Sequence, residues 1–267
     1  MQVDRNYFDI NGLMKPKLSY AIWFSQRTGS TLLCRALQSL EIAGKPSEWL
    51  SCYNPPDFSL LEKYQLDNYA ELQQRIWQLG TTPNGVFGIK GGIFEPYFGK
   101  IIQTLKQFPG CNPHTDNRVE IWHNAFPNCK HIYMTRRNKV RLAVSWWKAI
   151  QSEEWHREKG KLPTASNLKD KYSYDAIDHL FAECSMREAA IQEFFSEGSI
   201  LPLTIVYEDF ILAYKSTIRT VLSYLELPDI QNISIPDPPL QRLADNISEV
   251  WVQRFRQGKQ QGWQNYW

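Results

Sequence analysis

Short apolar segments alternate with longer amphipathic segments along the chain. The short segments are rich in β-branched and aromatic residues, which predicts buried strands at 19–24, 86–89, 131–135 and 200–207. The longer segments carry apolar residues at spacings of three and four, which predicts helices at 28–40, 60–79, 139–153, 174–195 and 210–225. We therefore expect a three-layer α/β fold: a central parallel sheet of about four or five strands with helices on both faces.

The remaining segments predict loops and a C-terminal cover. Glycine, asparagine and proline at 109–114 and 160–167 are typical of surface loops. The segment 228–239 is richer in proline and leads to 240–267, which we expect to pack back or to cover a ligand like a lid. We find no internal repeat and no low-complexity stretch, so we expect a single domain over 1–267.

Composition narrows the class of protein. The chain has 267 residues, of which 43% are hydrophobic and 22% charged, and its formal net charge is +2 at pH 7. This balance is that of a globular protein, and it excludes a disordered or fibrous chain. A charge so close to zero also argues against nucleic acid as a partner, because affinity for the phosphate backbone needs clustered, uncompensated Lys and Arg.

Cysteine spacing and the lengths of apolar runs indicate the cellular compartment that we expect for the protein. The five cysteines (Cys34, Cys52, Cys111, Cys129, Cys184) are scattered and never spaced as C-x-x-C, so neither a disulfide framework nor a zinc site is indicated. No apolar run approaches the roughly 20 residues of a membrane span, and the N-terminus lacks a signal peptide's apolar core. We expect a cytoplasmic protein without a transmembrane segment.

The strongest local signal lies between the first predicted strand and the first predicted helix. A small-residue turn at this place leaves backbone N–H groups unpaired at a helix N-terminus, where the peptide dipoles add positive potential. Such a turn suits a phosphate or sulfate, although the local pattern equally fits an ordinary turn capped by a hydroxyl. The residues are Ser25, Gln26, Arg27, Thr28, Gly29, Ser30 and Thr31.

The same loop lacks the parts of an ATP- or GTP-binding loop. That loop would read G-x-x-x-x-G-K-[ST], whereas here Gly29 is followed by Ser30 and the cation, Arg27, precedes the glycine. The later strands end in Lys90 and in 135–137 (T-R-R), without an acidic metal ligand. We therefore expect an anionic group that is bound without a metal.

These motifs carry a resemblance to a known family. The loop 25–31 resembles the 5′-phosphosulfate loop of sulfotransferases that use 3′-phosphoadenosine 5′-phosphosulfate (PAPS), especially the R-[ST]-G-[ST]-[ST] form of the carbohydrate enzymes. The segment 137–145 (R-N-K-V-R-L-A-V-S) resembles their second cofactor motif, and 44–49 (G-K-P-S-E-W) resembles the G-x-P-x-E-[FYW] element of the bacterial trehalose 2-sulfotransferase family. Weaker similarities at 87–90, 206–210 and 240–251 extend the resemblance to this family over most of the chain.

The resemblance implies a fold, a cofactor and roles for residues. It implies a P-loop-like fold, PAPS as sulfuryl donor, no metal, and a sugar, glycolipid or related small metabolite as hydroxyl acceptor. Arg137 and Ser145 would hold the donor's 3′-phosphate, and Glu48 would be the general base. The relatives are dimeric, which makes a homodimer plausible. The connection at 108–124 departs from the family by being longer and more polar.

Charge and position assign the remaining roles. Negative charge grows on the leaving group during sulfuryl transfer, and Arg27 with the loop N–H groups is placed to stabilise it. Lys90 ends the second strand at the sheet edge where ligands gather, so we assign it with Trp49 to acceptor binding. The ordinary interpretation of Glu48 is a solvated loop acid, and that of Trp49 is packing.

Two alternatives remain open at this point. The first is a small-molecule kinase on a P-loop-like fold, which would need a magnesium site. The second is a non-catalytic module that keeps the nucleotide pocket, against which the presence of both Arg27 and Glu48 argues.

Overall fold

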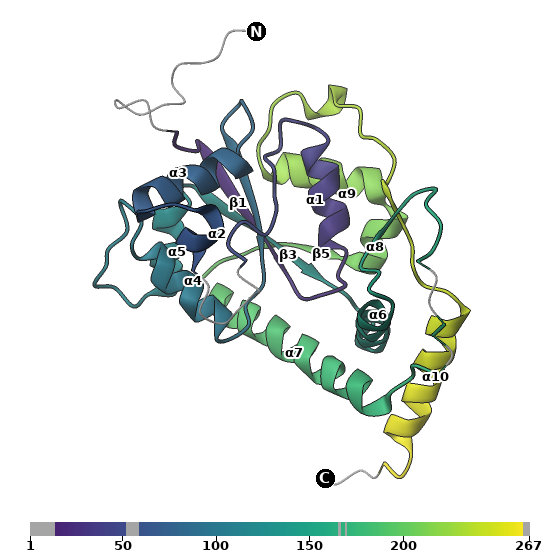
Figure 1. The fold of residues 1–267 in the computed structure, drawn as a ribbon. Helices are drawn as coiled ribbons and strands as arrows, with labels where there is room; N and C mark the ends of the chain where they lie inside the picture. Colours follow the sequence, from purple (N-terminus) through teal and green to yellow (C-terminus); the bar gives the residue numbers. More distant parts are fainter. Residues whose placement is uncertain (1–13, 52–58, 165–166, 169, 264–267) are drawn as a thin grey trace.

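The computed structural model describes residues 14–51, 59–164, 167–168 and 170–263. A parallel sheet with the order β2-β1-β3-β5 lies at its centre, and Figure 1 shows helices on both faces of that sheet. The predicted three-layer α/β architecture with a four-stranded parallel sheet is confirmed. The strands are β1 (Leu18–Phe24), β2 (Val86–Gly91), β3 (Cys129–Thr135), β4 (Arg157–Glu158), β5 (Leu203–Val206) and β6 (Leu240–Gln241). The helices are α1 (Ser30–Gln38), α2 (Leu60–Tyr64), α3 (Tyr69–Gly80), α4 (Tyr97–Leu105), α5 (Arg118–Ala125), α6 (Lys139–Ser152), α7 (Tyr174–Glu197), α8 (Tyr207–Leu212), α9 (Tyr214–Tyr224), the 3₁₀ turn η2 (Ile230–Asn232) and α10 (Asn246–Gln260).

β1 is buried on both faces, and its successive side chains enter two separate cores. Ala21 and Trp23 pack with α3, α4, α5 and the end of α7 on one face. Tyr20, Ile22 and Phe24 pack with α1, α8 and α9 on the other. Side chains alternate between the faces of a strand, so a central strand covered twice is apolar at nearly every position. This explains why β1 could be recognised from the sequence.

Two of the predicted helices are interrupted. The helix predicted at 60–79 ends at Tyr64, where Gln65 turns left-handed (φ 54°), and a new helix begins beyond the Asn68 cap. The helix predicted at 210–225 begins earlier, at Tyr207, and breaks at Ala213 before α9. The apolar spacing continues across both breaks because each new helix returns its apolar face to the same core, so periodicity alone did not reveal them.

Strand ends and one connection also differ from the predictions. β2 continues to Gly91, so Lys90 lies within the strand, whereas β5 ends at Val206 because Tyr207 already begins α8. The region 97–125 holds α4 and α5, which the apolar pattern did not predict. α5 is capped by Asn117, whose side chain accepts the N–H groups of two first-turn residues.

The C-terminal segment packs back onto the molecule over its described residues, and its role as a cover for a ligand stays a prediction. β6 pairs antiparallel with β4, and α10 lies against α6 and α7 (Figure 1). Trp251, Val252 and Phe255 of α10 are buried among side chains of those two helices. These contacts fix the segment beside the loop that follows α6.

No helix of the described residues is long and apolar enough to cross a membrane. The described cysteines are free thiols, and Cys52 lies outside the described residues.

His131 is buried in β3, and the exposed His123 of α5 lies against it. Trp23 donates its indole N–H to Nδ1 of His131 at 2.8 Å, and the Nε2 atoms of His131 and His123 lie 2.9 Å apart. Because Nδ1 of His131 accepts this hydrogen bond, the proton of its neutral ring lies on Nε2 and points at His123. Burial and the neighbouring His123 lower the pKa of His131 to about 3.

This pair predicts acid sensitivity of the fold. Between about pH 6.5 and pH 3 the unfolded chain binds a proton at His131 that the folded chain does not, so the free energy of unfolding falls as the pH is lowered. His131→Gln keeps a donor and an acceptor and should remove about 1.4 kcal/mol per pH unit of this slope. Urea unfolding between pH 4.5 and pH 7 measures it, and an unchanged slope would contradict the assignment.

Candidate active site

The turn between β1 and α1 is shaped for close approach of an anion. Its backbone is left-handed at Arg27 (φ 65°) and Gly29 (φ 85°). A Cβ at Gly29 would lie 2.7 Å from a ring carbon of Tyr207, so a side chain there would be both strained and obstructed. Gly29 is the N-cap of α1 and supplies no capping side chain. The first-turn N–H groups of α1 are therefore available to an anion.

The inner side of this loop is held by Glu188 of α7. Ser25 donates its hydroxyl to one Glu188 carboxylate oxygen at 3.0 Å, and Tyr133 and Thr135 donate theirs to the other at 3.1 and 3.0 Å. Lys139 forms an ion pair with the second oxygen at 2.5 Å. Glu188 thus ties the anion loop to the end of β3 and the start of α6, which are the elements that carry the second cofactor motif.

Two buried guanidinium groups face the outer side of the loop. Burial, followed by the nearby charge of Arg136, lowers the pKa of Arg27 to about 10. Burial likewise lowers the pKa of Arg136, whose guanidinium lies 4.7 Å above the Tyr207 ring. Two like charges that both lose water are stabilised by a bound anion. His156 lies in the same positive electrostatic potential: burial lowers its pKa, and so do the charges of Arg35, Arg27 and Lys90.

A cavity of about 480 Å³ adjoins these groups. Arg27, Gly29, Ser30, Thr31 and Ser145 line it, all of them residues that the sequence assigned to the cofactor. The two predicted cofactor motifs meet at this cavity, where Nε of Arg27 donates a hydrogen bond to the Ser145 hydroxyl at 3.1 Å. Arg27 also donates to the Trp155 carbonyl, which holds the loop after α6 over the cavity.

Four residues assigned to the cofactor do not line this cavity. Ser25 and Thr28 are fully buried and point inward, Thr28 donating to the Ser25 carbonyl at 2.8 Å. Gln26 also lies outside the lining. The side chain of Arg137 is 62% exposed and pairs with Asp209. These residues shape or flank the loop, and their assigned contact with the cofactor stays a prediction.

Arg136 lines the cavity where the sequence assigned Arg137. Glu208, in the first turn of α8, accepts the backbone N–H of Arg137 at 2.9 Å and lies 3.5 Å from Nε of Arg136. This contact turns the chain so that the side chain of Arg136 faces the cavity and that of Arg137 faces Asp209. Two adjacent arginines point to opposite sides, and only the register at the strand end decides which one faces a ligand.

Glu48 is positioned by a segment that runs beside β2. Ser47 bridges to Ile89 in parallel, and the N–H of Lys90 donates to the Ser47 carbonyl at 2.9 Å. Gly44 enters this arrangement with φ 71°, where a Cβ would lie 2.8 Å from the Gly88 nitrogen. The segment therefore behaves as an irregular extra edge of the sheet, and it aims Glu48 at the end of β2.

Lys90 connects Glu48 to the anion loop. Its ammonium lies 2.6 Å from a Glu48 carboxylate oxygen and 3.3 Å from the Thr31 hydroxyl. The same ammonium stands 4.5 Å above the Phe24 ring, and only 9% of the Lys90 side chain is exposed. The buried cation therefore joins the sequence's candidate base to the first turn of α1.

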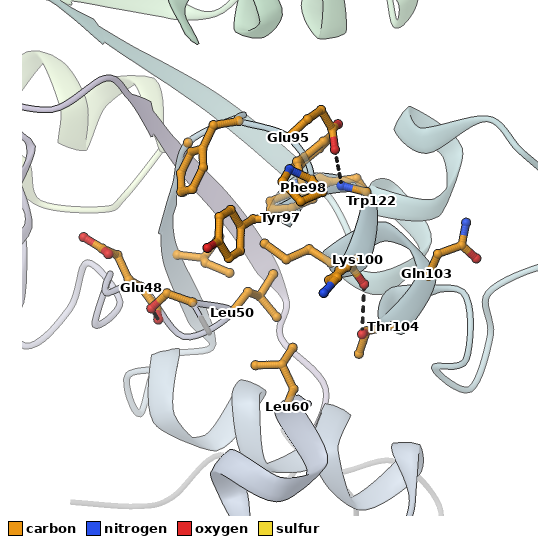
Figure 2. A pocket seen from close by; sticks show the side chains of 18 of the residues that line it. Glu48, Leu50, Leu60, Glu95, Tyr97, Phe98, Lys100, Gln103, Thr104 and Trp122 are labelled. Carbon is orange, nitrogen blue, oxygen red and sulfur yellow. Dashed lines mark hydrogen bonds between the residues drawn. The ribbon is translucent and has the colours of Figure 1, made fainter. Parts of the chain in front are cut away.

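Glu48 and Lys90 also line a second cavity, of about 720 Å³ (Figure 2). Figure 2 shows Glu48 at one side of it and Phe98 and Trp122 at the other, with Leu50 and Leu60 below. Thr31, the partner of Lys90, lines the first cavity. The two cavities thus approach each other across the Glu48–Lys90–Thr31 contacts.

Trp49 has a structural place beside this cavity. Its indole N–H donates to the carbonyls of Lys45 and Gly88 at 3.1 and 3.2 Å, and its ring packs against the core under β2. Trp49 does not line the second cavity, so its geometry suits fixing the neighbouring Glu48. Its assignment to acceptor binding stays a prediction.

Sequence reasoning missed Arg136, Glu188 and Tyr97. The pair of arginines after β3 was a signal for Arg136, but it could not tell one from the other. Glu188 lies mid-helix, where an acidic residue ordinarily faces water. Tyr97 lines the second cavity from α4, a helix that was not predicted. Among the described residues, no group of three or more His, Cys, Asp and Glu side chains is placed to hold a metal ion.

Comparisons with known proteins identify relatives over most of the chain. The profile of the family described as Stf0 sulphotransferase matches residues 19–258. Trehalose 2-sulfotransferase of Mycolicibacterium smegmatis is 27% identical over 91% of this chain and 96% of its own length. That of Mycobacterium tuberculosis is 25% identical over 89% of this chain and 94% of its own. A sulfotransferase crystal structure from Alicyclobacillus acidocaldarius aligns with a TM-score of 0.49 at 14% identity, covering 91% of this chain and 92% of that one.

The buried carboxylate beneath the loop predicts a large loss of stability on its removal. Glu188→Ala leaves the Lys139 ammonium and three hydroxyl groups without their shared partner, so the free energy of unfolding should fall by about 3–5 kcal/mol. Chemical denaturation measures the loss. Glu183→Ala is the control on the same helix, because its i,i+4 pair with Arg187 is more exposed and should cost about 1 kcal/mol or less. Equal losses would refute the structural role of Glu188.

Proposed function

The chain belongs to the Stf0 sulphotransferase family, and we propose that it transfers a sulfuryl group from PAPS to a hydroxyl of a sugar, glycolipid or related small metabolite. The observation that carries this proposal is the position of Lys90, which links Glu48 at one cavity to Thr31 at the other. The donor belongs in the cavity of Arg27 and Arg136, and the acceptor in the cavity of Glu48. The whole chain acts as one domain in this proposal, without a metal.

The donor cavity fits an adenosine bisphosphate carrying sulfate. Arg27, Gly29 and the first turn of α1 would bind its phosphosulfate, since they combine a guanidinium with free N–H groups. Ser145 and Arg136 would bind its 3′-phosphate. When bound, the donor supplies the sulfuryl group: a bond from the acceptor oxygen to sulfur forms while the bond from sulfur to the bridging phosphate oxygen breaks.

In this proposal, Glu48 would accept the proton of the acceptor hydroxyl. An alcohol is a weak nucleophile until a base takes its proton during attack. The ammonium of Lys90 at 2.6 Å favours the ionised carboxylate, the form that can accept this proton. Trp49 and Ser51 hold the backbone of Glu48, the Ser51 hydroxyl donating to the Glu48 carbonyl at 2.7 Å.

Arg27 and Lys90 would stabilise the charge that develops on the leaving group. Both are cations, and their side chains are largely or partly withdrawn from water, so their fields act at low dielectric. They are fixed before reaction by Ser145, Trp155 and Thr31. Transition-state stabilisation by such pre-set charge is the largest contribution expected from this site.

Two comparisons support a carbohydrate acceptor. The relatives from both mycobacterial species are described as trehalose 2-sulfotransferases and align over nearly their whole length. The element of this chain that bears Glu48 also lies in the aligned region. A homodimer is proposed on the resemblance to the family alone.

Glu48→Gln tests the proposal directly. The amide keeps the size of the side chain but cannot accept the proton, so turnover of sulfate from ³⁵S-labelled PAPS should fall about 10²–10⁴-fold. Binding of 3′-phosphoadenosine 5′-phosphate, followed by calorimetry, should stay unchanged. The control is Glu41→Gln, an exposed glutamate in the turn after α1, which should keep full turnover. A fully active Glu48→Gln enzyme would remove Glu48 from the mechanism.

Donor discrimination separates the two adjacent arginines. Arg136→Met should weaken binding of 3′-phosphoadenosine 5′-phosphate by about 10- to 100-fold, because it removes a buried charged contact to phosphate. It should leave binding of adenosine 5′-phosphate, which has no 3′-phosphate, nearly unchanged. Arg137→Met is the matched control and should change either affinity less than about threefold. The reverse result would restore the assignment that the resemblance implies.

A further inference from the structure

The walls of the acceptor cavity contain more hydrocarbon than a free sugar can use. Leu50, Leu60, Ile89 and Ile101 line it with aliphatic side chains, and Trp23, Phe98 and Trp122 add aromatic ones. Three of these, Trp23, Phe98 and Trp122, are also 98% or more buried in the core, so this wall is rigid. Aromatic faces can stack on sugar rings, but branched aliphatic side chains offer neither a flat face nor a hydrogen bond.

Three polar side chains around this cavity are hydrogen-bonded to backbone groups close to them in the sequence, and Lys100 also lines the cavity. Glu95 accepts the N–H of Gly99 at 3.1 Å, and the Thr104 hydroxyl donates to the Lys100 carbonyl at 3.0 Å (Figure 2). At the opposite side, the Ser59 hydroxyl caps α2 by accepting the N–H of Glu62 at 3.2 Å. Gln103 is exposed, and in Figure 2 its amide projects away from Glu48.

The charged pair that the proposal uses lies at the end of the cavity where the reaction is proposed. There the Glu48–Lys90 pair meets the anion loop, and Tyr97 contributes a phenol to the same lining. A hydroxyl at this end would find a base and donors. Hydroxyls further along would meet Leu50, Leu60 and Ile101, where each unpaired polar group costs about 1–3 kcal/mol.

We infer that the acceptor of this enzyme is amphipathic: its reacting hydroxyl sits beside Glu48, and an apolar body fills the Leu50–Leu60–Ile101 side of the cavity. This inference rests on the proposed sulfuryl transfer and narrows its acceptor. A volume of about 720 Å³ accommodates a ring system or an acyl chain in addition to one sugar unit. The class includes glycolipids and apolar alcohols, and it excludes a free disaccharide as the preferred acceptor.

A homologous series of acceptors tests this inference. The n-alkyl β-glucosides from methyl to octyl present the same sugar hydroxyls and differ only in buried methylenes. With saturating PAPS, kcat/KM should rise about three- to fourfold per added methylene until the cavity is filled, since that is the value of one buried CH₂. Octyl glucoside, below its micelle concentration, should exceed trehalose by at least about 100-fold. A flat series, or a preference for trehalose, would overturn the inference while leaving the sulfuryl transfer itself established.

Binding provides a readout that does not need turnover. Trp23 and Trp122 form part of the wall, so occupation by an alkyl chain should change tryptophan fluorescence. Affinities that rise along the series without any sulfate transfer would uphold the apolar site and refute the proposed function. Affinities that do not depend on chain length would refute the apolar site. 1-Octanol is the acceptor without a sugar. If it is sulfated at a rate comparable to octyl glucoside, the preferred acceptor is an apolar alcohol; if it is not sulfated, the preferred acceptor is a glycolipid.

A matched pair of variants locates the effect in the cavity. Ile101→Asn places an amide in the proposed apolar side and should reduce the advantage of octyl over methyl glucoside at least about tenfold. Ile150→Asn makes the same change on α6, where the side chain is 40% exposed, and should leave the series unchanged. The thermal midpoint of both variants is compared with that of the unaltered protein, and the chain-length series of the unaltered protein decides the question if Ile101→Asn does not fold. An undiminished octyl advantage in a folded Ile101→Asn enzyme would overturn the inference.

Discussion

The candidate site depends on two contacts of the largely buried Lys90 ammonium, one with Glu48 and one with Thr31. It contacts the Glu48 carboxylate at 2.6 Å and the Thr31 hydroxyl at 3.3 Å, and it comes from β2, the edge strand of the sheet beside β1. A cation whose side chain is 9% exposed needs an opposite charge, which the Glu48 carboxylate supplies, while the neutral Thr31 hydroxyl accepts a hydrogen bond from it. The contacts of Lys90 therefore fix the position of Glu48, the proposed base, relative to Thr31 of the proposed anion loop.

The donor side is an arrangement of positive charge that the fold holds in place without an internal counterion for every cation. Arg27 donates to the neutral oxygens of Ser145 and Trp155, and the pKa values of Arg27 and Arg136 are lowered chiefly by burial. Beneath the loop, the negatively charged Glu188 forms an ion pair with Lys139 and accepts hydrogen bonds from three hydroxyl groups. The positive charge of Arg27 above the loop is met only by neutral oxygens in the contacts described, which is what the proposed binding of phosphosulfate would require.

The acceptor side has the opposite character. Its walls are part of the hydrophobic core, and β1 supplies Trp23 to this wall while the loop that follows it supplies Arg27 to the other cavity. One strand and its loop therefore contribute to both cavities. In the proposed function, Glu48 would take up the proton between an apolar cavity and a cationic one.

The sequence by itself determined the α/β class, the four strands of the sheet, the anion loop and the motif that bears Glu48. These features depend on residues close together in the chain: a doubly buried strand is apolar throughout, and a strand-loop-helix turn carries its own glycine and hydroxyls. Tertiary structure alone decided which of Arg136 and Arg137 faces the cavity, that Glu188 braces the loop, and that helices 60–79 and 210–225 each break in two. It also decided the apolar character of the acceptor cavity. The facing of the arginines and the brace at Glu188 result from contacts between residues distant in sequence, such as Glu208 with Arg136 or Ser25 with Glu188, and local pattern holds no information about such contacts.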